Sequence, residues 1–485
     1  MYQVNSWCIA LLVFILFSSK IHAQDISFEY NNQNSIESIK HNAAYFPKDH
    51  FHLKSSIHSN FSSTNLSIHS IFNNQENQIG TITSLINDSN LQQMNFNLSS
   101  SLNVLTVGFR LNSKLYCGFN SNIQLNQQLN LDKNIPGLIF LGNSDTHYFG
   151  RPININLNNN QLRILNQNRV SIGYRYSDKL SFGLGISAIN ALYRIKTQSS
   201  SFELLSTLND SSIYEIQNKA NIRIETNGFN SFNSIINPVD LLLLRKPSNL
   251  SAVFDLGGIF RFNQYLRFSA SLKNLGSLNW SNNRLIHRIQ SEQITFTGFQ
   301  LPLQYNGAET PVKDSLFKWY DYNVLTANEP FSEKLNIGYH FSVEFFANPN
   351  HVFQYIYGNG YQIFNSNSIH SFAYKFNFNN FVFGSVSVSS NPLKKREPIF
   401  SGGLGFRFGP IQIQSSIYNF LAFNQINSPF QIGANIGIAL VLGRQSDKDG
   451  DGILDSKDKC PNRFGSSKNQ GCPKFYKFKN HIILH

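Results

Sequence analysis

The chain has 485 residues and a net charge of +12, yet only 14% of its residues are charged and 14% are aromatic. A typical soluble protein is roughly 25% charged, so this composition excludes a disordered chain, and the abundant Asn disfavours long helices. The Lys and Arg residues are scattered, without an arginine-rich arm or a reading motif, which excludes nucleic acid as a partner. The composition predicts an all-β protein.

The N-terminus carries an apolar run from Trp7 to Phe17, followed by small residues up to Ala23. A run of this length is too short to span a bilayer and is typical of a secretory signal peptide. We therefore interpret residues 1–23 as a signal peptide. After residue 24, no window reaches eighteen consecutive apolar residues, so no transmembrane helix is expected in the mature chain.

Residues 24–443 repeat strand-sized segments of alternating polarity joined by very short turns. Four hairpins are predicted in this way: 169–176 with 180–187, 253–262 with 265–272, 371–378 with 381–388, and 402–408 with 411–420. Long strands, short turns at one end and long Asn/Ser-rich loops at the other are typical of a closed antiparallel transmembrane β-barrel. We expect about fourteen strands, with 430–442 as the last. A soluble secreted β protein remains the alternative.

Two long segments, 198–248 and 280–334, are expected to form extracellular loops or strand extensions of the barrel. The glycine pairs at 257–258 and 402–403 mark bulges, places where another backbone approaches, or small residues in a crowded interior. Asp255 and Arg261 are expected to face the lumen as a charged pair. Cys117 lies in a strand-like stretch and is interpreted as a small buried hydrophobe.

Residues 444–473 contain the sharpest chemical signal of the chain. Carboxylates occupy positions 1, 3, 5, 9 and 12 of a twelve-residue window, with Gly452 at position 6 for the turn and a backbone carbonyl at position 7. All the candidate ligands are oxygens, which calcium prefers. The predicted calcium ligands are Asp447, Asp449, Asp451, Ile453, Asp455 and Asp458. A solvated acidic linker is the alternative.

Cys460 and Cys472 follow the acidic window in a tail rich in Pro and Gly. Because the signal peptide places them outside the reducing cytosol, we expect them to form a disulfide. The remaining residues, 474–485, alternate Lys with Phe and Tyr and form either a docking element or a frayed end. The sequence contains no Gly-x-Ser-x-Gly, no His-Glu-x-x-His and no Gly-rich phosphate loop, so a non-enzymatic protein is expected.

At its hairpins the chain resembles a family of uncharacterised Bacteroidota outer-membrane barrels, related in style to the PorP/SprF-type barrels associated with type IX secretion and gliding. The matching pieces include Asn42-Ala-Ala-Tyr-Phe-Pro47, residues 138–143, 169–186 and 254–258, and Ser269 to Trp280. The family usually begins this part with Asn-Pro-Ala, whereas here Ala43 replaces the proline. Residues 447–473 are similar to a thrombospondin type 3 repeat. The resemblance implies a fold and an outer-membrane location but no activity.

The leading hypothesis is a non-enzymatic outer-membrane barrel with an envelope or secretion-associated role and a calcium-binding periplasmic tail. Its expected partners are outer-membrane lipid and, as a further candidate, a periplasmic or secretion-machinery protein. One alternative is a passive or hydrophobic-solute transporter, against which a lumen fully plugged by the barrel's own side chains and the N-terminus would argue. The other alternative is a secreted or surface adhesin-like binding protein, for which the long loops would be the binding surface.

Overall fold

The computed structural model describes most of the barrel and scattered parts of the tail. The described residues are 28, 34–47, 49–63, 92–210, 214–228, 249–280, 284–296, 321–327, 329–359, 368–378, 381–390, 398–421, 430–444, 455, 458–461, 463, 465, 469–472, 477–478 and 481–482. The predicted signal peptide lies outside these residues.

Fourteen strands form a closed antiparallel ring. Around the ring they are β1 (Asp49–Ser63), β2 (Gln93–Arg110), β3 (Leu115–Asp132), β5 (Gln161–Arg175), β6 (Leu180–Leu208), β8 (Leu250–Arg261), β9 (Leu266–Trp280), β13 (Gly338–Asn348), β14 (His351–Asn359), β15 (Ser368–Phe378), β16 (Val382–Ser389), β17 (Ile399–Phe408), β18 (Ile411–Tyr418) and β19 (Phe430–Arg444). Strand β19 pairs with β1 from Asp49 opposite Arg444 to Ser63 opposite Phe430, which closes the ring. Closure leaves no unpaired edge, as a sheet in lipid requires.

The four predicted hairpins and the predicted last strand are confirmed. Each hairpin turns within a few residues, as at Gly409-Pro410 between β17 and β18, where Gly409 adopts a φ of 59° that disfavours other residues. All the short turns lie at one end of the ring, together with the start of β1 and the end of β19. Outer-membrane barrels place their short turns in the periplasm. We call this end the periplasmic end, and the opposite one the extracellular end.

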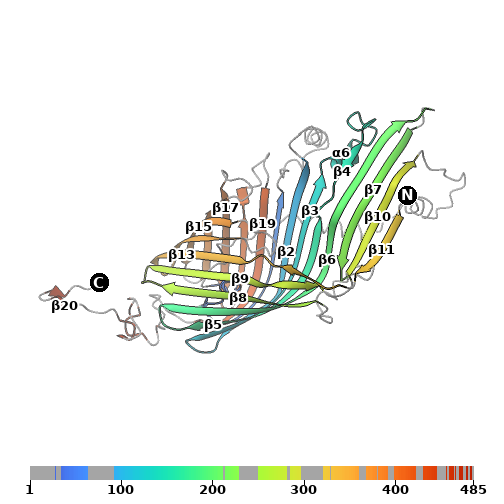
Figure 1. Cartoon of the computed structure of the whole chain (residues 1–485). Helices are drawn as coiled ribbons and strands as arrows, with labels where there is room; N and C mark the ends of the chain where they lie inside the picture. Colours follow the sequence, from blue (N-terminus) through green and yellow to red (C-terminus); the bar gives the residue numbers. More distant parts are fainter. Residues whose placement is uncertain are drawn as a thin grey trace.

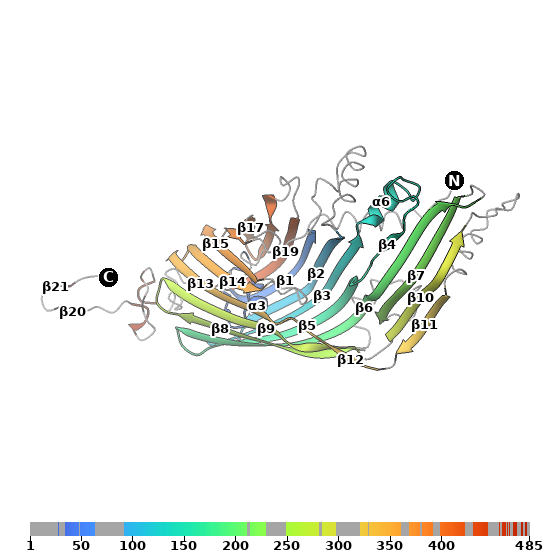
Figure 2. The same ribbon diagram turned by 45° about the horizontal axis from the view of Figure 1, so that its top comes forward.

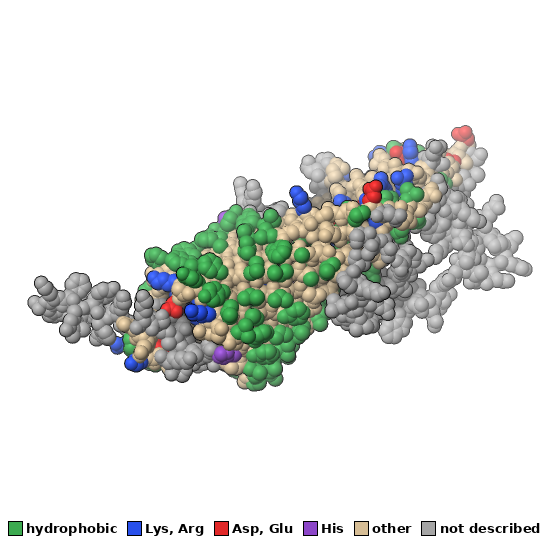
Figure 3. Space-filling view, turned by 60° about the horizontal axis from the view of Figure 1, so that its bottom comes forward, with side chains coloured by type: hydrophobic (Ala, Val, Ile, Leu, Met, Phe, Trp, Pro, Cys, Tyr) green, Lys and Arg blue, Asp and Glu red, His purple; other side chains and the backbone are tan. Residues whose placement is uncertain are grey.

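The two faces of the wall differ in polarity at every second residue. In β18, Ile411, Ile413 and Ile417 are exposed on the outside, whereas the side chains between them, such as Gln412 and Gln414, are buried. This period of two gives the outside an apolar band, of which Figure 3 shows one face as a green surface. A closed ring with an apolar outer band and a polar lumen is a transmembrane barrel of the bacterial outer membrane.

A sheet extends from the ring at its extracellular end (Figure 1). Strand β6 is 29 residues long, and only its first part pairs with β8 in the ring. Its second part pairs with β4 (Ile153–Ile155) and β7 (Tyr214–Asn227), followed by β10 (Arg284–Phe296) and β11 (Asp321–Ala327). The two long segments, 198–248 and 280–334, are expected to form extracellular loops or strand extensions of the barrel. Their described parts form strand extensions.

The remaining elements are short. Helix α3 (Ser38–His41) lies inside the ring (Figure 2), and α6 (Asn134–Phe140) lies in the connection between β3 and β4. Strand β12 (Phe331–Lys334) pairs with the end of β9, and β20 (Lys477–Phe478) pairs with β21 (His481–Ile482). Among the described residues, no helix is long and apolar enough to cross a membrane. Cys117 of β3 is half-buried rather than buried, because its position alternates with the inward Tyr116 and Gly118.

Candidate functional site: a plugged lumen and its apolar mouth

Residues 34–47, here called the plug, lie inside the barrel. Glu37 and Ala44 are 0% exposed, and Ile36 and Tyr45 are 1% exposed, although the segment itself holds only the single turn of helix α3. The burial therefore comes from the wall that surrounds the segment and not from packing within it. Sequence patterning does not mark this segment, because its burial depends on fourteen strands that follow it in the chain.

Glycines on the inner face of the wall make room for the plug. A side chain at Gly183 would collide with the backbone of Ala43 and Ala44, and one at Gly257 with the side chain of Asn42. Of the three explanations of the 257–258 pair, the approach of another backbone is therefore correct for Gly257. Gly258 faces outward, and a side chain there would meet no atom within 4 Å.

A buried ion pair ties the plug to strand β1. Glu37 Oε1 lies 2.9 Å from Lys54 Nζ and accepts a hydrogen bond of 2.9 Å from Ser56 Oγ, while its other oxygen pairs with Lys40 of the plug itself. Asn103 of β2 donates to Ser56 Oγ at 2.8 Å. A buried carboxylate is stable only when cations and hydrogen-bond donors surround it. Strand β1, through Lys54 and Ser56, and strand β2, through Asn103 on Ser56, therefore fix the position of Glu37.

A second contact joins the plug to strands β5 and β8. Arg169 Nη1 of β5 donates to the carbonyl of Ile39 at 3.0 Å, and Arg169 Nε lies 2.8 Å from Asp255 Oδ2. The prediction that Asp255 faces the lumen is confirmed, but its expected pairing with Arg261 is wrong. Strands β5 and β8 both flank β6, so Arg169 and Asp255 can meet across its glycines, whereas Arg261 lies further along β8.

Aromatic residues hold the end of the plug near the periplasmic turns. The Arg267 guanidinium lies 5.7 Å from the ring centre of Tyr45 and is paired with Glu344 of β13 at 2.5 Å. The Arg175 guanidinium lies 5.0 Å from the ring of Phe46, a distance at which a cation and an aromatic ring attract each other. The plug is thus attached to the wall by hydrogen bonds, ion pairs and ring contacts. Its covalent link to the wall is the chain that leads into β1.

An apolar cluster lies at the extracellular end of the lumen. Its buried members come from β5, β6, β8 and β9 and from the segment after β12: Leu165, Ile189, Ala191, Val253, Leu278, Trp280 and Leu335. Phe331 of β12 stacks on Trp280 with 6.4 Å between the ring centres. This is the largest apolar cluster inside the described wall, and it contrasts with the Ser, Asn and Gln side chains that line the lumen elsewhere.

Charged residues of the extension sheet lie next to the apolar cluster. The Arg194 guanidinium lies 4.9 Å from the ring of Phe331, and its Nη1 is 3.0 Å from Glu225 Oε1. Arg284 Nε approaches the same oxygen at 2.8 Å. Burial raises the pKa of the Glu225 carboxyl, but the two guanidinium groups outweigh burial and hold this pKa below its usual range. The mouth therefore holds a packed apolar cluster beside fixed positive and negative charges.

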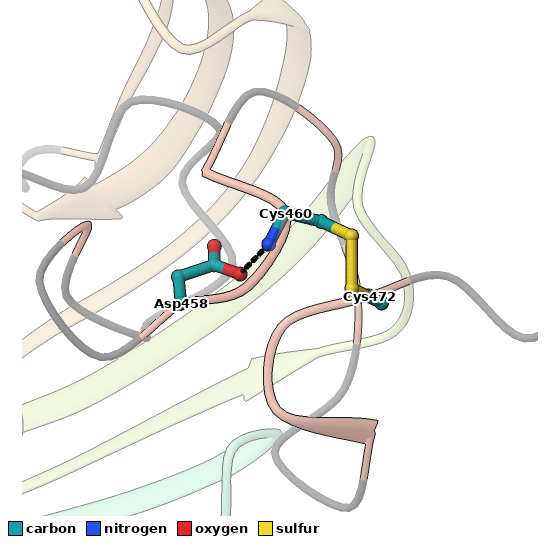
Figure 4. Close-up of a disulfide and its surroundings, with 3 residues drawn as sticks. All are labelled: Asp458, Cys460 and Cys472. Carbon is teal, nitrogen blue, oxygen red and sulfur yellow. Dashed lines mark hydrogen bonds between the residues drawn. A yellow bond between two sulfur atoms is a disulfide. The ribbon is translucent and has the colours of Figure 1, made fainter.

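The predicted calcium ligands fall mostly outside the described residues. This applies to Asp447, Asp449, Asp451 and Ile453, while Asp455 and Asp458 are described. Asp458 Oδ1 accepts a hydrogen bond of 2.6 Å from the Cys460 backbone N–H (Figure 4), and its Oδ2 is buried without a hydrogen-bond partner. A buried carboxylate oxygen without a hydrogen-bond partner is suited to bind a metal ion. Within the described part, no group of three or more possible ligands is assembled, so calcium stays a prediction.

Cys460 and Cys472 are joined as a disulfide with their Cα atoms 5.0 Å apart (Figure 4). The bridge closes a loop with a sequence separation of 12. Gly471, at a φ of 85°, lies against Asp458, so the bridge brings the end of the loop back to the last predicted calcium ligand. The tail therefore has a local covalent constraint, whereas the plug has none.

Comparison with known proteins gives a family and a set of similar folds. Residues 44–417 match a family described as "Family of unknown function (DUF5723)". No curated protein matches the chain.

Similar solved structures include the toluene transporter TbuX of Ralstonia pickettii, with a TM-score of 0.43, 9% identity, and coverage of 84% of this chain and 94% of that one. The toluene transporter TodX of Pseudomonas putida has a TM-score of 0.40 and 9% identity, covering 87% and 95%. A Pseudomonas aeruginosa FadL homologue has a TM-score of 0.39 and 8% identity, covering 84% and 93%. These likenesses say nothing of what this chain carries.

Proposed function

The chain belongs to the family of unknown function DUF5723, and we propose that it is a passive outer-membrane channel for hydrophobic solutes, closed by its plug. A fully plugged lumen argues against an open transporter, but this plug supports a gated one, because none of the strand pairings of the wall involves it. A separate segment of 14 residues, 34–47, fills the lumen through non-covalent contacts with inward glycines, Ser, Asn and charged residues. A barrel with a purely structural role could fill its lumen with side chains of its own wall, as small barrels do.

A plugged lumen argues against a permanently open pore. In the described conformation, the plug occupies the inside of the wall between β1, β5, β6 and β8. Transport therefore requires the plug to move, which the wall allows because none of its own strand pairings involves residues 34–47. The proposal is a gated channel, in which the plug is one state of the gate.

The apolar cluster at the mouth supports a hydrophobic solute. Side chains such as Leu278 and Trp280 face the lumen, where every second residue is otherwise polar. These side chains are packed against one another in the described conformation, so an apolar solute held here would replace contacts that they now make with each other. The proposal is that the cluster opens to hold such a solute before it passes the plug.

Reconstituted vesicles test the proposal. The full-length protein and a variant lacking residues 34–47 are compared for uptake of radiolabelled toluene and for ion conductance. The variant is expected to conduct ions continuously, while the intact protein conducts little and takes up toluene. The variant Leu278→Asn is expected to reduce toluene uptake about tenfold without changing conductance. A plug-free barrel that stays impermeable, although it migrates as a folded barrel, contradicts the proposal.

A second candidate function concerns the tail. The loop closed by Cys460 and Cys472 follows β19, whose end lies at the periplasmic end of the ring. A calcium-bound tail in this position is suited to holding the barrel against a periplasmic or secretion-machinery protein. Its calcium site and its similarity to a thrombospondin type 3 repeat are part of this proposal. No enzymatic step is needed for either function.

A further inference from the structure

The outside of the barrel carries a groove across strands β13 to β17. The groove has a volume of about 640 Å³ and is lined mainly by Val, Phe and Tyr side chains. Phe353 and Phe372 are more than half exposed on its walls, so the groove opens on the lipid-facing surface and not on the lumen. It is therefore separate from the plug and from the apolar mouth.

Two rows of paired residues build the groove. The upper row runs from Val343 through Tyr355, Phe372 and Val388 to Phe400, each opposite the next in the sheet. The lower row runs in the same register from Phe345 through Phe353, Tyr374 and Val386 to Gly402. Most of the large aromatic side chains are on β13 to β15, while the upper row ends on Phe400 of β17 and the lower row on Gly402, which has no side chain.

Gly402 of β17 lies beside the groove, opposite the lining residue Val386. A Cβ atom built at Gly402 would meet only the Ser385 carbonyl oxygen, at 3.6 Å, which is an ordinary van der Waals distance. The inward neighbour Gly403, in contrast, is covered by Phe28. The space beside Gly402 is thus on the membrane side and is not filled by this chain's own described side chains.

The extracellular end of the groove carries polar groups. Tyr355, which lines the groove, hydrogen-bonds through its hydroxyl to His370 Nδ1 at 2.8 Å. The His370 ring also lies 4.8 Å from the ring of Tyr357, and His370 is exposed. A Tyr and His cluster at the boundary of the apolar band is suited to the headgroup level of a bilayer, where aromatic residues with a polar end are enriched.

We propose that this groove is a specific binding site for one acyl chain of an outer-membrane lipid, whose phosphate headgroup is held by His370. The groove lies within the lipid-contacting band, so its occupant comes from the bilayer. Its concave form favours a single hydrocarbon chain over the convex wall of a second barrel. The imidazole of His370 can donate a hydrogen bond to a phosphate oxygen, which gives the site a polar end as well as an apolar one.

Lipid retention by the full-length protein tests this site. The protein is reconstituted into vesicles of phosphatidylethanolamine and phosphatidylglycerol, extracted in mild detergent, and weighed intact by native mass spectrometry. We expect one phospholipid per barrel to be retained. Gly402→Leu places a side chain beside Val386 at the β17 edge of the groove and is expected to lower retention about tenfold. The matched control is Gly258→Leu, an outward glycine of β8 with the same open surroundings, which should retain the lipid.

The headgroup contact is tested by His370→Phe, which keeps an aromatic ring beside Tyr355 and Tyr357 but removes both nitrogens. This variant should lose phospholipid about fivefold and retain uncharged diacylglycerol from matched vesicles as the wild type does. Equal lipid retention by Gly402→Leu, Gly258→Leu and the wild type would overturn the proposal. A wild-type dimer that Gly402→Leu dissociates would also overturn it, because the occupant would then be a second copy.

Discussion

The N-terminal plug and the C-terminal tail both leave the ring at its periplasmic end, yet they are held in opposite ways. The plug has no disulfide and is held by contacts with β1, β5, β8 and β9. The tail is closed by a disulfide between residues that lie 12 apart in sequence. The plug therefore depends on the complete barrel, whereas the tail depends on residues close to it in the chain. Mutations should affect the two ends independently.

The largest effect is expected at a glycine that seats the plug. Gly183→Leu places a side chain where the backbone of Ala43 and Ala44 lies, so the plug must leave its position. We expect ion conductance to rise by at least about tenfold and residues 34–47 to become accessible to protease. Single-channel recording and limited proteolysis measure the two effects. Gly258→Leu, at an outward glycine, is the control. A Gly183→Leu barrel that is folded, closed and protease-resistant would show that Gly183 is not needed to hold the plug in place.

The next effect is expected at the buried ion pair of the plug. Glu37→Gln leaves Lys40 and Lys54 buried without their carboxylate, which costs about 3 kcal/mol in comparable sites. Docking of the plug should weaken by about a hundredfold, seen as a higher open probability in bilayer recordings. The double variant Glu37→Gln, Lys54→Met removes one of the unpaired charges and should close the channel again in part. Equal open probabilities in the single and double variants would show that the pair does not hold the plug.

A smaller effect is expected at the tail disulfide. Cys460→Ser removes a constraint worth about 3 kcal/mol in a loop of this size, because the unfolded tail regains its freedom. The tail should then be cleaved faster by protease, while the heat-dependent gel mobility of the barrel and its conductance stay unchanged. Cys117→Ser, a substitution in the wall, is the control. A change in conductance would mean that the tail and the plug are coupled.

The smallest effect is expected from removal of calcium. A chelator should expose the tail to protease while the barrel keeps its heat-dependent gel mobility, because the predicted ligands follow β19, the last strand of the ring, in the chain. Asp449→Asn should reproduce this exposure without chelator. Tail protection that is the same with calcium, with chelator and in the variant would contradict the predicted site.

Much of the barrel could be predicted because its signal is local. Alternation in 411–420 and 430–442, with short turns such as Gly409-Pro410, marks strands and hairpins without knowledge of distant residues. The disulfide partners could be predicted for the same reason. The strand number followed from the chain length divided by the usual length of a strand and its loop.

The plug could not be predicted, because nothing within residues 34–47 determines its burial. Asn42 to Pro47 stood out only as part of a family resemblance, and the same residues in solution would be an ordinary polar segment. The partner of Asp255 was mistaken for a related reason. Facing the lumen follows from strand alternation, but the choice between Arg261 and Arg169 depends on which strands lie side by side across β6.

By itself the sequence determined an all-β membrane barrel with about fourteen strands and an apolar outer face, and it predicts a signal peptide and a calcium-binding tail. These properties follow from periodicity and spacing, which act between residues close in the chain. Only the tertiary structure decided that the N-terminal segment fills the lumen, that Glu37 pairs with Lys54, and that aromatic residues of β13 to β15 form a groove on the membrane side. Those features exist because closure of the ring brings together residues that are far apart in the chain.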